Sequence, residues 1–269
     1  METPGGRINL KVIPISQLRP HEQTVVRLSE DLRRAILEDG VQRDPIVVDQ
    51  GSGIVLDGMH RLESLREIGA RSVIAYLVDY ADPRVKLYRW YRFVKKPGDG
   101  VARNIIGELG LENVGTIGAG AQAAAPATRL LVTYRGEAFG AEVTGDIAED
   151  TRAMRAFDLA VARRGLQVEF MDEASASSGL LAGDDLFLLT PKFGKEDVLR
   201  AGREGRLFPP KSTLHVLPIR PLGLNYPIED LRAGRDVLES VVSSRRPRLI
   251  EAPSSFRGRV YREGIVVFE

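Results

Sequence analysis

One short segment, residues 57–61, combines the residue types that proteins use to hold phosphate. Asp57 and Gly58 supply a turn, and His60 and Arg61 follow in the expected first turn of a helix. The unpaired N–H groups and positive dipole end of a helix start favour an anion, and an arginine can grip two oxygens at once. The segment therefore predicts an anion site. An ordinary strand-to-helix junction with a surface histidine and arginine is the alternative.

A second polar cluster follows two prolines, Pro209 and Pro210. The prolines fix the backbone as extended, so Lys211, Ser212 and Thr213 are presented from a stiff loop, with His215 close behind. One cation and two hydroxyl groups suit a phosphate or a carboxylate. A proline-rich return strand with solvated side chains remains the alternative.

The elements that must position these residues follow from hydrophobic spacing. Residues 54–56 form an apolar strand, and Leu62, Leu65 and Ile68 recur at helical spacing until Gly69 ends the helix. The preceding chain predicts further strands and one helix with an apolar stripe, namely strand 10–15, helix 24–38 and strand 45–48. Strands 73–78 and 85–91 complete a compact mixed domain.

A charged segment with two glycines and a proline, residues 95–100, is typical of a linker. The chain beyond it alternates between helix and strand patterns, with helices at 101–111, 147–164 and 195–204 and strands at 130–134, 138–143, 167–171 and 186–189. The tail after Ser243 predicts a short added hairpin. The fold class is therefore α+β, with domains at 1–94 and 95–232 and a C-terminal extension at 233–269.

The composition excludes several classes of function. The chain has 269 residues, is 43% hydrophobic and carries a formal net charge of +1, which argues against a dedicated nucleic-acid binder. It has no cysteine, so thiolate zinc sites and cysteine nucleophiles are excluded. No apolar run approaches the roughly 20 residues of a membrane span, and we expect a cytoplasmic protein.

Four blocks in a fixed order resemble the archaeal-type free L-serine kinases of the ParB/sulfiredoxin-like superfamily. The match covers most of residues 10–231, and the blocks that carry it are 18–23, 57–61 with 69–71, 79–80 with 85–91, and 205–218. The D-G-x-H-R block alone indicates the superfamily. The P-H-E block at 20–22 and the P-K-S-T-x-H-V block at 210–216 indicate the kinase.

The resemblance implies transfer of the β-phosphate of ADP to the hydroxyl of free L-serine, giving O-phospho-L-serine and AMP with Mg²⁺ as the ion. Phosphoserine would then serve cysteine synthesis. Glu22 corresponds to the catalytic base, because a serine hydroxyl is a poor nucleophile until its proton is taken. The other implied site residues are Asp57 (metal, phosphate and catalysis), His60 (phosphate and catalysis), Gly58, Met59 and Arg61 (phosphate), and Trp90, Lys211, Ser212, Thr213 and His215 (substrate). The second domain would close the cleft that holds both substrates.

Two positions depart from the resemblance. Met59 occupies a position that is typically a second histidine, and Leu214 one that is often an arginine, so a polar contact to substrate is lost at each. These changes keep open a nucleotide sensor without turnover. A CTP- or ADP-binding regulatory or DNA-partitioning protein is the main alternative, whereas sulfiredoxin chemistry needs a cysteine. The choice between ADP and ATP and the oligomeric state stay open.

Overall fold

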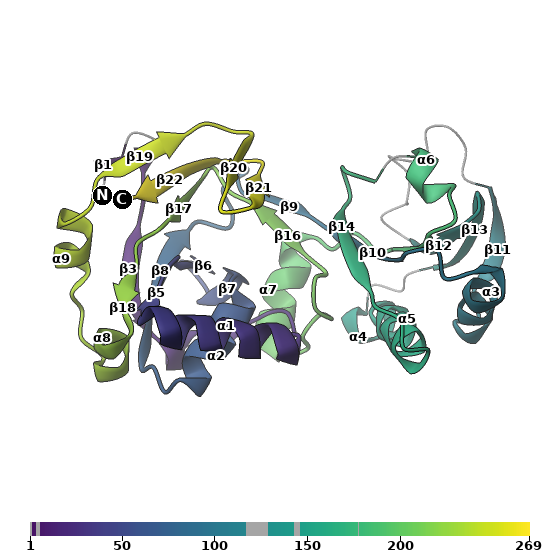
Figure 1. Cartoon of the computed structure of the whole chain (residues 1–269), viewed down its shortest axis with the longest axis horizontal. Coiled ribbons are helices and arrows are strands. Elements are labelled where there is room, and N and C mark those ends of the chain that lie inside the picture. Colours follow the sequence, from purple (N-terminus) through teal and green to yellow (C-terminus); the bar gives the residue numbers. More distant parts are fainter. Residues whose placement is uncertain (1, 4–5, 117–128, 143–145, 177) are drawn as a thin grey trace. The chain divides into compact units, whose positions relative to one another are not determined.

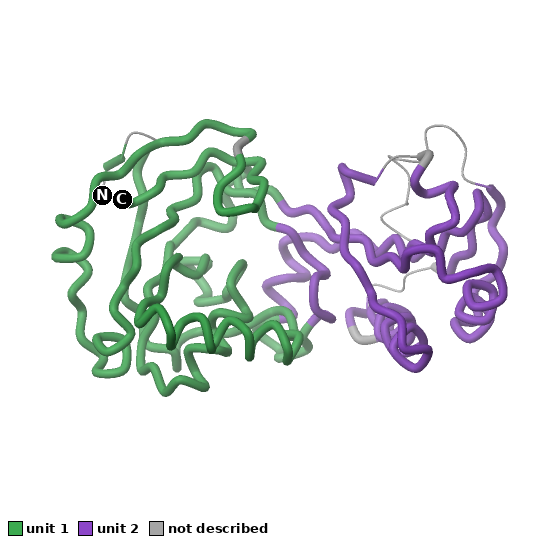
Figure 2. The backbone as a smooth tube through the Cα atoms, in the orientation of Figure 1, with its two compact units in different colours: residues 1–86, 202–207, 215–269 green, residues 87–201, 208–214 purple. Residues whose placement is uncertain are grey.

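The chain forms two compact units (Figure 2). The computed structural model describes residues 2–3, 6–116, 129–142, 146–176 and 178–269. Unit 1 contains residues 1–86, 202–207 and 215–269, and unit 2 contains residues 87–201 and 208–214. Unit 2 is therefore inserted into unit 1 in the order of the chain, and the chain passes between the units more than once.

Unit 1 is built on a five-stranded sheet of order β3-β8-β6-β7-β4. β8 pairs antiparallel with β3 and parallel with β6, while β7 pairs antiparallel with β6 and parallel with β4. The central strands are buried and rich in β-branched residues, which suits a sheet covered on both faces. The bounds are β3 Leu10–Pro14, β4 Arg19–Pro20, β6 Ile46–Asp49, β7 Ile54–Asp57 and β8 Ser72–Val78.

Two helices, α1 (Val26–Asp39) and α2 (Met59–Glu67), lie side by side in unit 1 (Figure 1). The Ser64 hydroxyl on α2 joins them by donating to the backbone carbonyl of Ser29 on α1 at 2.8 Å. α1 ends at Gly40, which adopts a left-handed conformation (φ 67°) and donates its N–H to the Ile36 carbonyl. A short 3₁₀ turn, Ile15–Gln17, connects β3 to β4.

The C-terminal segment adds a second sheet to unit 1, of order β17-β22-β19. β22 pairs parallel with β17 and antiparallel with β19. The hydrophobic core beside this sheet contains Leu222, Tyr261, Ile265 and Val267. The bounds are β17 Ile219–Leu222, β19 Pro247–Ile250, β20 Ser254–Phe256, β21 Arg259–Tyr261 and β22 Gly264–Phe268. The smaller elements of unit 1 are β1 Glu2–Thr3, β2 Gly6–Arg7, β5 Val41–Gln42, β18 Tyr226–Pro227, α8 Ile228–Ala233 and α9 Leu238–Ser243.

Unit 2 contains a six-stranded antiparallel sheet of order β11-β13-β12-β15-β10-β14. One face of β10 carries Tyr91 and Phe93, and Phe93 stacks on Phe187 with ring centroids 5.1 Å apart. The strands are β10 Trp90–Val94, β11 Glu112–Thr116, β12 Arg129–Tyr134, β13 Glu137–Glu142, β14 Glu169–Asp172 and β15 Leu186–Leu189. The helices are α3 Asp99–Glu108, α4 Ile147–Asp150, α5 Arg152–Arg163 and α6 Ser178–Leu181.

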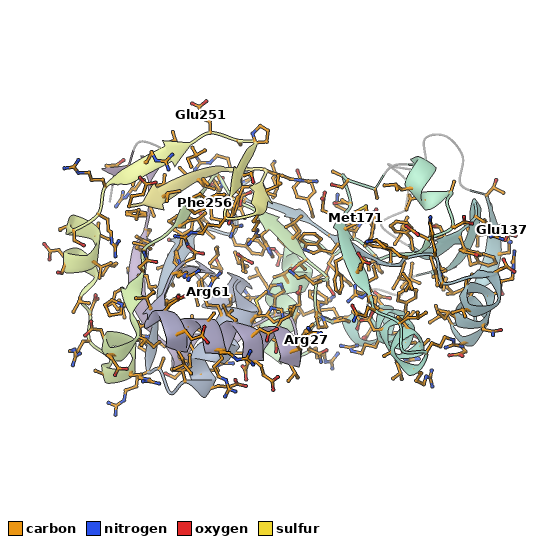
Figure 3. All side chains as sticks on the ribbon, in the orientation of Figure 1. Arg27, Arg61, Glu137, Met171, Glu251 and Phe256 are labelled. Carbon is orange, nitrogen blue, oxygen red and sulfur yellow. The ribbon has the colours of Figure 1, made fainter. Side chains whose placement is uncertain are left out.

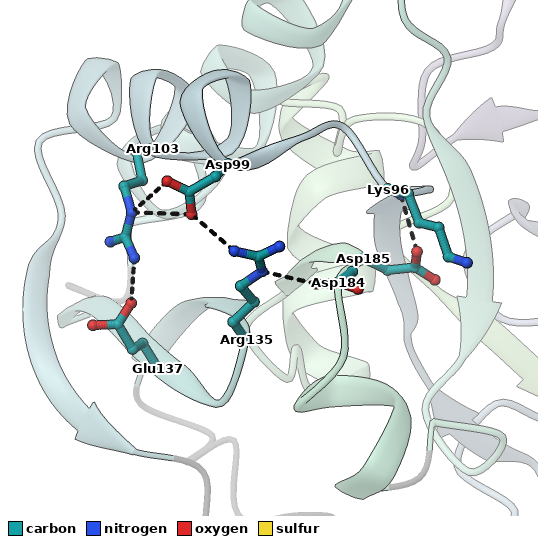
Figure 4. Close-up of polar contacts among 7 residues, drawn as sticks. All are labelled: Lys96, Asp99, Arg103, Arg135, Glu137, Asp184 and Asp185. Carbon is teal, nitrogen blue, oxygen red and sulfur yellow. Dashed lines mark hydrogen bonds and ion pairs between the residues drawn. The ribbon is translucent and has the colours of Figure 1, made fainter.

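Three further elements contain residues of both units: β9 (Lys86–Tyr88), β16 (Leu214–Val216) and α7 (Lys195–Glu204). On the surface of unit 2, an exposed set of ion pairs links α3 to the β12–β13 turn (Figure 4). Arg103 contacts Asp99 and Glu137, and Arg135 contacts Asp99 and Asp184. These side chains are about half exposed, so each pair contributes little to stability.

The predicted α+β class is confirmed, but several element boundaries differ. The expected strand 85–91 divides into β9 and β10 at Arg89, which is buried and bonded to Glu173. The expected helix 147–164 divides at Thr151, whose hydroxyl donates to the Ile147 carbonyl. The tail is more than an added hairpin, because β22 pairs with β17 of unit 1.

The compact units also differ from the expected domain ranges. Residues 87–94 group with unit 2, because β10 lies between β15 and β14 in its sheet. Residues 233–269 group with unit 1. None of the helices in the described ranges combines the length and the hydropathy needed to cross a membrane.

Candidate active site

The turn at Asp57 and Gly58 joins β7 to α2 and presents the N-terminus of that helix. Gly58 has a φ of 97°, and a Cβ atom there would lie 2.8 Å from Cγ2 of Ile46. Both facts require glycine at this position. Met59 begins α2 and is buried, while Asp57 remains half-buried. The predicted strand, turn and helix are therefore present at residues 54–67.

His60 and Arg61 each make a backbone contact from the first turn of α2. The Val25 N–H donates to Nε2 of His60 at 3.0 Å, just before α1 begins. Nη1 of Arg61, which is labelled in Figure 3, donates to a backbone oxygen. Its acceptor is the Pro45 carbonyl at 2.9 Å. His60 thus connects the starts of the two helices. The prediction that His60 and Arg61 contact phosphate stays a prediction.

Two histidines and a tyrosine form a buried group in unit 1. His21 is fully buried, and its Nδ1–H donates to the Val55 carbonyl at 2.6 Å. Its ring meets that of His215 edge to face, with centroids 5.6 Å apart. Nε2 of His215 lies 2.8 Å from the hydroxyl of Tyr80. These contacts bring together three segments that are far apart in sequence.

Burial lowers the pKa of His21 below its usual value, although the Glu22 carboxylate, the Val55 carbonyl and Asp57 oppose this shift. His21 is therefore neutral near pH 7, with its proton on Nδ1. The Glu22 carboxylate lies 3.9 Å from Nε2 of His21 and its side chain is 6% exposed. The structure thus places Glu22 in a buried position beside a neutral imidazole, and its predicted role as a base stays a prediction.

Arg220 on β17 connects this buried group to the turn at Asp57 and Gly58. The sequence patterns did not predict this role for Arg220. Its Nη1 donates to Oδ2 of Asp57 at 2.6 Å, and its Nη2 donates to the His215 carbonyl at 3.1 Å. Its Nε donates to Oε1 of Glu263 at 2.6 Å. Burial would lower the pKa of Arg220, but the charges of Asp57 and Glu263 outweigh it and raise that pKa.

In unit 2, the loop 208–214 lies against β10. Nζ of Lys211 is 5.2 Å from the centroid of the Trp90 ring, a cation–π contact. Lys211 has a φ of 56°, and the Ser212 hydroxyl donates to the Pro209 carbonyl at 2.7 Å. The backbone turns at Pro210 and Lys211, so it is not extended there as the two prolines predict.

Arg92 also holds this loop, and the sequence reasoning did not single it out. Its Nη2 donates to the Pro210 carbonyl at 2.6 Å, and its Nε pairs with Asp158 on α5 at 3.0 Å. Arg92 follows Trp90 by two residues on β10, so both side chains lie on the same face of that strand. The available signal in the sequence was the alternation of residues 90–93, which places Arg92 on the same face of the strand as Trp90.

The structure thus gathers the predicted site residues into two groups. Unit 1 holds Glu22, Asp57, Gly58, Met59, His60, Arg61 and His215, and unit 2 holds Trp90, Lys211, Ser212 and Thr213. Tyr80, Arg220 and Glu263 join the first group and Arg92 the second. Asp79 and Tyr80 belong to one of the four sequence blocks, but the block did not predict that the Tyr80 hydroxyl contacts His215.

The donor set suits a cation that is carried by a nucleotide. Within the described ranges, no three side chains of histidine, cysteine, aspartate or glutamate cluster as a cation site. Asp57 is 33% exposed and shares one oxygen with Arg220. Mg²⁺ commonly binds one or two carboxylates together with substrate phosphates and waters, so Asp57 is compatible with it.

Comparisons with known proteins agree with the motifs. The chain is 24% identical over 237 residues to the ADP-dependent L-serine kinase of Thermococcus kodakarensis, covering 86% of this chain and 96% of that protein. It is 28% identical over 241 residues to the ATP-dependent L-serine kinase of Staphylothermus marinus, covering 85% and 94%.

The fold is similar to that of a free serine kinase solved in complex with ADP, with a TM-score of 0.68 at 23% identity. That match covers 86% of this chain and 97% of the other. No protein-family model matches the chain. The predicted resemblance to the free serine kinases is confirmed.

Proposed function

We propose that this protein is an ADP-dependent L-serine kinase that forms O-phospho-L-serine and AMP. The observation that carries the proposal is the buried group in unit 1, where Glu22 lies beside His21 and the Arg220 contacts join His215 to Asp57. Similarity to two L-serine kinases over 85–86% of the chain supports it. The resemblance also implies that its product serves cysteine synthesis.

Glu22 is the general base of the proposed reaction. Its carboxylate takes the proton of the serine hydroxyl while the bond from that oxygen to the β-phosphorus forms and the bond to the bridging oxygen of AMP breaks. The adjacent His21 stays neutral and so adds no positive charge that would weaken Glu22 as a base.

The phosphate groups are held at the turn that starts α2, by the backbone N–H groups after Gly58 and by His60 and Arg61. Asp57 would hold Mg²⁺, which neutralises charge on the transferred phosphoryl group when bound. Trp90, Lys211, Ser212, Thr213 and His215 would contact the substrates. Phosphoryl transfer depends mainly on such positioning and charge neutralisation.

The first experiment supplies ADP, ATP or CTP separately with L-serine and Mg²⁺ and measures phosphoserine together with the nucleotide product. We expect phosphoserine and AMP from ADP. The similar kinases are named for two different donors, so phosphoserine and ADP from ATP alone would keep the reaction and change the donor. A nucleotide that binds without any product would reject the kinase and support the sensor.

The base is tested with Glu22→Gln, which preserves shape and removes the carboxylate. We expect turnover to fall by about 10²–10⁴ with little change in nucleotide affinity, because the base acts on serine. Glu38→Gln on α1 is the matched control, since Glu38 is exposed. Near-normal turnover in Glu22→Gln would show that another group takes the proton.

The partitioning alternative has little support. Such a protein should follow its nucleotide domain with a helix-turn-helix and a basic surface. Here residues 87–201 include a six-stranded antiparallel sheet, and the formal net charge is +1. Salt-dependent binding of DNA by this chain would support the partitioning alternative.

A further inference from the structure

Arg220 connects three segments of unit 1 through three different nitrogens. Nη1 reaches Asp57 at the end of β7, Nη2 reaches the backbone of His215, and Nε reaches Glu263 just before β22. A guanidinium is planar and rigid, so its three directions are fixed relative to one another. Any shift of one contact therefore shifts the other two.

Glu263 is the more enclosed of the two carboxylates that pair with Arg220. Its side chain is 5% exposed, as is that of Arg220, whereas that of Asp57 is 33% exposed. A buried carboxylate needs a charged partner, and here Arg220 supplies it. Glu263 thus holds the guanidinium from the side away from solvent, and Asp57 is the member through which the group faces solvent.

The C-terminal segment fixes Glu263 in place. Glu263 precedes β22, which pairs with both β17 and β19, and Arg220 itself is on β17. The parallel pairing sets Arg220 opposite Ile265, two residues after Glu263. The segment after residue 243 is therefore linked to Asp57 through Glu263 and Arg220.

We propose that Glu263 is a positioning residue for the phosphate site, acting through Arg220 on Asp57 and His215. The expected kinetic effect rests on the proposed function, whereas the contacts of Arg220 do not depend on that function. It makes the C-terminal segment part of the apparatus that holds the nucleotide. Loss of the Glu263 charge releases Arg220, and Asp57 and His215 then lose their fixed separation.

The kinetic test compares Glu263→Gln and Arg220→Lys with the wild-type chain. Lysine keeps the charge but cannot reach three acceptors at once. We expect both variants to lower kcat by about 10–100-fold, the cost of a small misplacement, and to raise the KM for the nucleotide. The KM for L-serine should change less than that for the nucleotide, because Arg220 holds His215 by its backbone carbonyl and the other implied substrate residues belong to unit 2.

Glu269→Gln is the matched control. Glu269 ends the same segment, pairs with Arg248 and is 55% exposed. A purely structural role for Glu263 would lower only the active fraction, so kcat would fall while both KM values stayed unchanged. That result, or behaviour of Glu263→Gln like that of Glu269→Gln, would overturn the inference.

A spectroscopic test separates this inference from the proposed function. The chain has three histidines, His21, His60 and His215, and all of them are in unit 1. Glu263→Gln should move the imidazole NMR signals of His215 and leave those of His60 unmoved, since His60 is held by Val25. If the wild-type chain makes no phosphoserine, the kinase proposal fails, and this shift still decides the role of Glu263. Unmoved His215 signals would reject it.

Discussion

Arg220 in unit 1 and Arg92 in unit 2 are both buried, and the two units compensate these charges differently. Arg220 in unit 1 has two carboxylate partners and a carbonyl, with all three nitrogens in use. Arg92 in unit 2 has one carboxylate, Asp158, and one carbonyl, that of Pro210. Its Nη1 has no hydrogen-bond partner among the residues that the structure describes.

The difference shows that the number of partners decides how firmly a buried arginine holds the segments that it contacts. Two carboxylates hold Arg220 from two sides, so movement of the guanidinium breaks at least one strong contact. Arg92 is held on fewer sides, and burial raises the pKa of Asp158 even though Arg92 opposes this. We infer that the turn at Asp57 is held more rigidly than the loop 208–214.

The largest expected effect is that of Arg220→Met. It leaves the Glu263 carboxylate buried without its partner, which should lower the free energy of unfolding of unit 1 by about 3–5 kcal/mol. The imidazole NMR signals of the three histidines follow this unit during urea unfolding. The double variant Arg220→Met/Glu263→Met should recover most of the loss. Failure to recover it would mean that packing, and not charge, explains the effect.

Arg92→Met should cost less, about 1–3 kcal/mol in the free energy of unfolding of unit 2. Asp158 is 33% exposed, so water can solvate its carboxylate after the change. Trp90 is the only tryptophan and belongs to unit 2, so its fluorescence reports this transition. If Arg92→Met lowered the free energy of unfolding as much as Arg220→Met, the two arginines would not differ in the way that we infer.

A pH effect should distinguish unit 1 from unit 2. The pKa of His21 is lowered in the folded state, so below about pH 6.5 the unfolded chain binds a proton that the folded chain excludes. This contribution to the stability of unit 1 is present above that pH and is lost as the pH falls towards the folded pKa. Urea unfolding at several pH values between about 5 and 8 measures it.

His21→Asn is the control for this effect, because an asparagine amide can still donate to the Val55 carbonyl but does not titrate. The variant should lose part of the pH dependence in the histidine signals and leave the Trp90 transition unchanged. An unaltered pH dependence in unit 1 would assign it to other groups.

The smallest effect is expected on the exposed network of Figure 4. Arg103→Ala removes contacts to Asp99 and Glu137 that are largely solvated. The unfolding midpoint of unit 2 should stay within experimental error of the wild-type value, and high salt should not change that result. A shift as large as that of Arg92→Met would mean that the network acts cooperatively.

Local patterns predicted the elements well where spacing alone decides them. β15 and α7 have the bounds that the hydrophobic spacing predicts, and α1 ends where Gly40 follows its apolar stripe. The turn at Asp57 and Gly58 was also predictable, because it needs a glycine between a strand and a helix. The roles of the predicted site residues in catalysis stay predictions.

The Arg220–Glu263 pair was not predictable, because 43 residues separate its members. Glu263 stands between Arg262 and Gly264, a polar sequence typical of an exposed turn. Its burial depends on β22 pairing with β17 in parallel, and no local period encodes a parallel partner. Sequence spacing therefore found the turn at Asp57 and Gly58 but missed Arg220 and Glu263, which hold it.

The place of β22 between β17 and β19 has a consequence for synthesis on the ribosome. Residues 87–214 include all of unit 2 and emerge before residue 264, so this unit can fold while unit 1 still lacks the central strand of its second sheet. Until then Arg220 has no Glu263 to pair with. We expect nascent chains that stop before residue 263 to contain a folded unit 2 and a unit 1 in which Arg220 lacks its buried partner.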